Sequence, residues 1–176
     1  GSLRRESYNR RLAQAAIKLA PPALAFDEVE IGGLSLYNQD LDASPPESWI
    51  AFRDQIRRAD GLLFATPEYN RSVPGVLKNA IDIGSRQAGH SVWNGKPAAI
   101  VSATPGTTGA FGANHHLRQC FVTLNTPVMP APEIYLSGAD KLLDESGALK
   151  DENVTKLLTA FMRGFADWVA RFATNG

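Results

Sequence analysis

Two short, uninterrupted apolar runs constrain the fold more than any other feature of this sequence. They are Gly61–Thr66 (GLLFAT) and Ala98–Thr104 (AAIVSAT), and neither alternates between apolar and polar residues. Continuous apolar runs of this length are typical of strands that are covered on both faces, as in parallel sheets. Because parallel strands need crossover connections, which are usually helices, the two runs predict an α/β protein.

Helical patterns lie around these runs, as such a fold requires. Residues Glu6–Ala20 carry one apolar face and stop at Pro21-Pro22. Ser44-Pro45 starts a second helix, which Asp60-Gly61 ends. Further helices are predicted at Pro74–Arg86, Asn114–Leu124 and 154–172, weaker strands at Phe26–Ile31 and Glu133–Leu136, and a loop at Pro105–Gly112.

One element of a doubly wound fold is missing at the start of the printed sequence, which opens directly on a loop. In the common strand order 2-1-3-4-5 the first strand lies inside the sheet. Its loss would leave a gap between two other strands. We therefore expect a chain printed without its first strand, rather than a fold without one. Residues 1–176 are expected to form a single domain.

The composition argues against several kinds of partner. Lys and Arg together number 18, as do Asp and Glu, so the net charge is zero, which disfavours nucleic acid. No apolar run approaches the ~20 residues of a membrane span. The three His residues suggest no metal site. The single cysteine, Cys120, forms no intrachain disulfide, which is compatible with a cytoplasmic protein. It is expected to be a small buried hydrophobic residue on a helix, with a redox thiol as the alternative.

The first motif is the opening segment Gly1–Asn9 (GSLRRESYN). Small and hydroxylated residues stand just before a helix, where free N–H groups and the positive end of the helix dipole favour a phosphate. Ser2, Ser7 and Asn9 can each donate a hydrogen bond, and Arg4 can add a charged one. Neither GxxxxGK[ST] nor GxGxxG is present, so a monoester phosphate fits better than a triphosphate or a dinucleotide. A helix that Ser7 simply caps remains the alternative.

The second motif, Thr66–Asp82 (TPEYNRSVPGVLKNAID), leaves a buried strand and enters a helix. Open α/β sheets bind ligands at this carboxyl edge. A polar and aromatic loop stiffened by Pro67 and Pro74 can lie along a flat heterocycle. The alternative is a loop whose Tyr69 and Asn70 only satisfy local turns.

These two motifs together resemble the NADPH-dependent FMN reductase family, which includes soluble quinone and chromate reductases of bacteria. The match lies in the PEYNxSxPGxLKNAID run, in the GSxRxxSxN loop and in their order and spacing. A third segment, Ser102–Gly112, stands where the family has a second flavin-edge loop, and His116–Gln119 is similar to its HLRQ sequence. The resemblance implies a flavodoxin-like three-layer α/β sandwich with a parallel sheet of order 2-1-3-4-5.

The resemblance also implies FMN as the cofactor and assigns it residues. The phosphate would be bound by Ser2, Arg4, Ser7 and Asn9. The isoalloxazine would be lined by Pro67, Glu68, Tyr69 and Asn70, and its other edge and the ribityl chain by Ser102, Thr104 and Gly106. The flavin N5 would carry the chemistry, so no side chain is assigned as a catalytic acid or base and no metal is expected.

The expected function is electron transfer from NADPH or NADH, through bound FMN, to quinones, free flavin, metal oxyanions or similar small acceptors. The alternative is a non-enzymatic electron carrier of the flavodoxin type, although such carriers are strongly acidic and this chain is neutral. A flavin-free regulatory protein on the same fold is a third possibility.

Assembly into a homodimer or homotetramer is expected on two grounds. The apolar residues of Pro74–Arg86, among them Ile83, cover more of that helix than one core face requires, and members of the family form dimers or tetramers. Packing of Ile83 under the Gly-rich loop of its own chain is the alternative. Two departures from the family pattern, Ile83-Gly84 in place of an aromatic residue and Arg71 after PEYN, are expected to affect substrate access or subunit packing.

Overall fold

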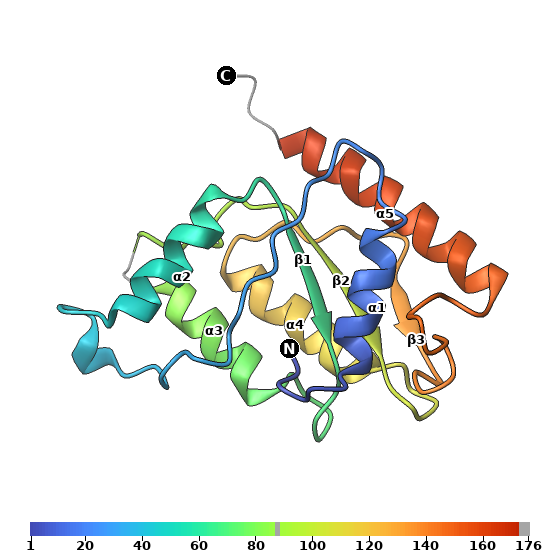
Figure 1. Cartoon of the computed structure of the whole chain (residues 1–176). Helices are drawn as coiled ribbons and strands as arrows, with labels where there is room; N and C mark the ends of the chain where they lie inside the picture. The colour runs from blue at the N-terminus through green and yellow to red at the C-terminus, as the bar shows by residue number, and fades with distance from the viewer. Residues whose placement is uncertain (87–88, 173–176) are drawn as a thin grey trace.

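The computed structural model describes residues 1–86 and 89–172, and it has a three-stranded parallel sheet at its centre (Figure 1). The strands are β1 (Leu62–Thr66), β2 (Ala98–Ala103) and β3 (Ile134–Leu136), and they lie in the order β1-β2-β3. Leu62 pairs with Ala98 and Val101 pairs with Ile134. Every residue of β2 is buried, because β2 is the central strand and helices cover both faces of the sheet. The α/β class and the parallel sheet are confirmed.

Within the described part of the chain, five α-helices cover the sheet on its two faces (Figure 1). α1 (Tyr8–Ile17) and α5 (Glu152–Phe172) lie on one face, and α2 (Glu47–Arg58), α3 (Gly75–Ser85) and α4 (Phe111–Thr123) lie on the other. Gln39–Leu41 forms one turn of 3₁₀ helix. The arrangement is a three-layer sandwich.

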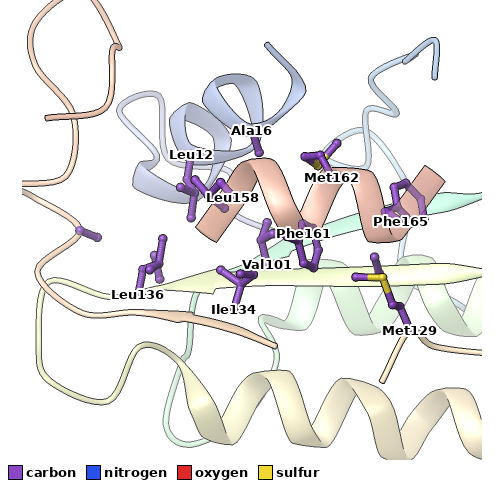
Figure 2. Packing of buried hydrophobic residues seen from close by; sticks show 13 residues of the cluster. Leu12, Ala16, Val101, Met129, Ile134, Leu136, Leu158, Phe161, Met162 and Phe165 are labelled. Atoms are coloured by element: carbon purple, nitrogen blue, oxygen red, sulfur yellow. The ribbon is translucent and has the colours of Figure 1, made fainter. Parts of the chain in front are cut away.

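Each face of the sheet has its own apolar core. Figure 2 shows the core under α1 and α5, where Leu12 and Leu158 meet above the sheet and Phe161 lies over Val101. On the opposite face, Trp49, Phe52, Ile83 and Trp93 pack together near α2, and Ile81, Ile100, Leu117 and Phe121 pack together near α4. These cores fix the sheet, and the sheet in turn fixes the loops at its carboxyl edge.

The strand predicted at Phe26–Ile31 is wrong, because these residues form no ladder. They run past a cavity of about 790 Å³ that also borders β1, with α1 and α2 contributing to its walls. Alternate side chains still face opposite layers. Phe26 packs in the core under α1, whereas Val29 and Ile31 pack against the core near α2. The segment is extended like a strand, but the cavity separates it from the edge of β1. In the strand order 2-1-3-4-5, this cavity lies where the first strand would stand.

Two further expectations need correction. The loop predicted at Pro105–Gly112 ends earlier, because α4 already begins at Phe111. The expectation that Ile83 faces a partner is also wrong: Ile83 is fully buried in its own chain, among Trp49, Phe52 and Trp93 rather than under the Gly-rich loop. The excess apolar surface of α3 is therefore covered within the chain by α2 and Trp93.

Candidate functional site

Three loops meet at the carboxyl edge of the sheet, and they are the three that the sequence motifs predicted to lie together. The Gly1 amino group donates to the Ala65 carbonyl at 2.7 Å, which places the first loop beside the end of β1. Asn9 bonds the backbone of Ala103, at the end of β2. Glu68 reaches from the loop after β1 to the first turn of α4. This edge is where open α/β sheets hold ligands.

The first loop ends in a capped helix. Ser7 is the N-cap of α1, and its hydroxyl oxygen accepts from the Arg10 amide at 3.2 Å. The hydroxyl proton of Ser7 has no acceptor among the described residues, so it can still be donated to a ligand. Arg4 is exposed and lies over the Tyr8 ring at 4.9 Å. The Ser2 hydroxyl accepts from the Arg4 amide at 3.3 Å. A free hydroxyl proton, an exposed guanidinium and the start of a helix suit an anionic group.

Asn9 has a different environment from the other residues of this loop. Its side chain is 3% exposed. The amide nitrogen donates to the Ala103 carbonyl at 2.9 Å, and the amide oxygen accepts from the Ala103 N–H, also at 2.9 Å. Both ends of the amide are thus used to tie α1 to the end of β2. This geometry supports a tether more than a phosphate donor.

The second loop contains a tight hairpin between Tyr69 and Ser72, each of which donates its backbone N–H to the carbonyl of the other at 3.0 Å. The two central residues are left-handed, with φ 51° at Asn70 and φ 68° at Arg71, as in a type I′ turn. Asn tolerates that conformation, whereas Arg adopts it at a cost of about 1–2 kcal/mol. The turn presents Tyr69, which is 49% exposed. Pro67 precedes it, and its carbonyl accepts from the Thr66 hydroxyl at 2.8 Å.

Glu68 points away from the hairpin tip and into the protein. Its side chain is only 8% exposed. One carboxylate oxygen accepts from the Ala113 amide in the first turn of α4 at 3.1 Å, and the other lies 3.5 Å from an Arg71 guanidinium nitrogen. Such a carboxylate caps the N-terminus of a helix, where its charge is favourable. The cap also explains why α4 extends back to Phe111.

The third loop is supported by buried polar groups. Ser102 is fully buried and donates to the Gly109 carbonyl at 2.8 Å, so its hydroxyl holds the loop rather than facing solvent. The Asn114 amide nitrogen donates to the Ser102 hydroxyl at 3.1 Å. Thr104 and Gly106 lie on the exposed part of the loop, with the Thr104 hydroxyl 3.3 Å from the Gly106 carbonyl. Sequence reasoning missed Asn114, although an Asn between the apolar residues Ala113 and Leu117 was a signal of a buried polar contact.

An aromatic cluster stands beside the third loop, and sequence reasoning missed it as well. Phe111, His115 and Tyr135 lie within 4.1–5.8 Å of one another between ring centroids, and the Tyr135 hydroxyl is 3.0 Å from His115 Nε2. Burial and the neighbouring Glu133 carboxylate raise the pKa of Tyr135 to about 12, so it is neutral at physiological pH. His115 and His116 are both exposed on the surface of α4.

Cys120 on α4 is partly buried, and burial raises the pKa of its thiol.

Among the described residues, no three His, Cys, Asp or Glu side chains come together as metal ligands. No helix in residues 1–86 or 89–172 has the length and apolar character needed to cross a membrane.

Comparison with known proteins agrees with this arrangement of loops. The family model described as NADPH-dependent FMN reductase matches residues 1–141, which include all three loops. The chain belongs to the NADPH-dependent FMN reductase family. Within this family it is 58% identical over 170 residues to a quinone reductase of Pseudomonas putida, covering 96% of the chain and 91% of that relative. It is 49% identical over 169 residues to a 2-hydroxy-1,4-benzoquinone reductase of a Burkholderia species, covering 96% and 92%.

The chain is also similar to a solved structure over nearly its whole length. A flavoenzyme NAD(P)H:(acceptor) oxidoreductase from Paracoccus denitrificans superimposes with a TM-score of 0.91 at 40% identity, covering 98% of this chain and 94% of that one. One departure from the FMN reductase pattern now has a physical reason. A Cβ at Gly84 would lie 2.5 Å from ring atoms of Trp93. The Trp93 indole therefore packs directly on α3 at Gly84 and occupies the space that a larger side chain would need. The Trp93 ring nitrogen is fixed by a 2.8 Å hydrogen bond to the Ile81 carbonyl.

Proposed function

We propose that this protein is an NAD(P)H-dependent oxidoreductase that uses noncovalently bound FMN to reduce quinones and similar small acceptors. The observation that carries the proposal is the convergence of a phosphate-suited helix start with two stiffened loops at one edge of the sheet. The relatives named quinone reductase, with up to 58% identity over nearly the whole chain, support it independently.

The start of α1 suits the FMN phosphate. The Ser7 hydroxyl proton, the Arg4 guanidinium and the Ser2 hydroxyl lie at the positive end of the helix. A dianionic monoester would bind there through charge-assisted hydrogen bonds and would also be favoured by the helix dipole. Asn9 would act beneath it by holding the helix start against Ala103.

The two loops that follow suit a flat ring. Pro67, Tyr69 and Asn70 would border one side of the isoalloxazine, and the exposed loop at Thr104 and Gly106 would border the other side and the ribityl chain. Ser102 would act through the loop that it holds, since its hydroxyl is buried on Gly109. When bound at this edge, FMN would supply the redox chemistry, the two-electron transfer between nicotinamide and acceptor. The chain's own residues bind and orient the ring and keep the loops in place.

The proposal extends to assembly and compartment. A homodimer or homotetramer is proposed by analogy with the family, although Ile83 takes no part in it. The cytoplasm is the proposed compartment, since the lone Cys120 needs no oxidising environment. We also propose that residues 1–176 form a single domain.

One set of measurements tests the proposal against its rivals. The purified protein should be yellow, the released cofactor should be FMN, and NADPH or NADH should be oxidised steadily when a benzoquinone is added. FAD, or no flavin after incubation with FMN, would refute the assigned cofactor. A yellow protein that exchanges electrons with a reductase but does not oxidise either nicotinamide would instead be an electron carrier.

A further inference from the structure

The start of α4 has no cap of its own. The N-cap position is Ala110, which is left-handed at φ 61° and has no side chain that can bond the first turn. A helix start leaves several N–H groups without intrahelical partners. In α4 one of these, the Ala113 amide, is bonded by Glu68, which belongs to a loop 45 residues earlier in the chain.

The contact is too close to tolerate a side chain at Gly112. A Cβ at that position would lie 2.9 Å from the Glu68 carboxylate and 3.1 Å from the Arg71 carbonyl. Glycine therefore lets the loop after β1 lie directly on the first turn of α4. A second link lies one helical turn further on, where the Ser72 hydroxyl is 2.7 Å from His116 Nδ1.

We propose that Glu68 is a positioning residue that clamps the Pro67–Pro74 loop to the start of α4, so that the two flavin-edge loops form one rigid unit. The inference deepens the proposed function and rests on it for its effect on flavin. It differs from a role in lining the ring, since the buried carboxylate is used on Ala113 and Arg71. The clamp fixes the hairpin that presents Tyr69 relative to the loop that carries Thr104 and Gly106.

The clamp predicts which ligands lose affinity. Both loops border the isoalloxazine ring, which FMN and riboflavin share. A loosened clamp should therefore weaken the binding of both flavins by the same factor. Ser7→Ala should weaken FMN alone, because Ser7 lies at the phosphate. The flavin-free protein should show the clamp as well, since the contact needs no ligand.

The test is amide hydrogen exchange of the flavin-free protein, followed by titration with FMN and riboflavin. In Glu68→Ala, the exchange rate at Ala113 and across Pro67–Pro74 should rise about tenfold. This is the factor expected when a hydrogen bond to a charged group is lost. Glu68→Gln keeps an acceptor oxygen and should restore most of the protection. Arg71→Ala is the matched control. Its guanidinium is 79% exposed and 3.5 Å from the carboxylate, so exchange should hardly change.

Gly112→Ala gives a second test if Glu68→Ala does not fold. Helix propensity alone predicts that alanine stabilises α4, whereas the clamp predicts faster exchange at Ala113, because the new Cβ displaces the carboxylate. Unchanged exchange in both Glu68→Ala and Gly112→Ala would overturn the clamp. A change of flavin absorbance in Glu68→Gln with unchanged exchange would also overturn it in favour of ring contact. Because exchange is read without flavin, failure of the proposed cofactor would leave this result intact.

Discussion

Replacing Asn9 distinguishes a tether from a phosphate ligand. In Asn9→Ala the N–H and C=O of Ala103 both lose their partner, and both lie in a buried part of β2. Leaving a buried polar group unsatisfied costs about 1–3 kcal/mol. Allowing for partial relaxation, we expect the free energy of unfolding of the flavin-free protein to fall by roughly 2–4 kcal/mol. For a domain of this size that corresponds to roughly 4–16 °C in melting temperature.

Urea unfolding of the flavin-free protein, followed by circular dichroism, measures this loss. Asn9→Asp should be destabilised as well, because a carboxylate would face the Ala103 carbonyl in place of the amide nitrogen. Ser2→Ala is the control, since Ser2 lies in the same loop and its hydrogen bond with the Arg4 amide is exposed. A loss below about 0.5 kcal/mol, the scatter of ordinary surface substitutions, combined with weaker FMN but unchanged riboflavin binding, would refute the tether and make Asn9 a phosphate ligand.

Three further predictions concern other parts of the chain. Ser7→Ala should weaken FMN binding roughly tenfold while riboflavin binding changes little, and the lost cap should lower the free energy of unfolding of the flavin-free protein by about 1 kcal/mol. Equal weakening of FMN and riboflavin binding in titrations would contradict the phosphate contact. Gly84→Ala should destabilise by about 1–3 kcal/mol in urea, because its Cβ would meet Trp93, whereas Gly75→Ala in the same helix has open space and should not destabilise. Tyr135 should ionise near pH 12 rather than at its ordinary value of 10.0, as read by tyrosinate absorbance. Between those two pH values the unfolded state releases this proton first, so stability should fall as pH rises, and Tyr135→Phe should abolish that part of the fall.

The sequence predicted the elements whose signal is local. GLLFAT and AAIVSAT became β1 and β2, because a continuous apolar run carries its own evidence of burial on both faces. A cap was the alternative role considered for Ser7 from its place before a helix, and Ser7 does cap α1, while its role as a phosphate donor stays a prediction. The convergence of the loops was implied by the family resemblance, and the structure gives its physical basis, since parallel strands end at the same edge.

What the sequence did not reveal depends on distant partners. Phe26–Ile31 has the alternation of a strand, but a strand exists only where a neighbour bonds it, and here a cavity lies beside it. The first turn of α4 looked like loop because its cap, Glu68, comes from another motif. The apolar residues of α3 suggested a partner, because the sequence did not show that Trp93 returns to cover Gly84.

The segment that runs past the cavity beside β1 should respond to salt. Residues 23–31 line this cavity, and Arg10 on α1 holds them through ion pairs with Glu28 and Glu30 at 2.8 Å each. The side chains of these pairs are largely exposed, and high salt screens exposed charges. Salt should therefore loosen the 23–31 segment and leave the sheet, whose contacts are apolar and backbone hydrogen bonds, unchanged.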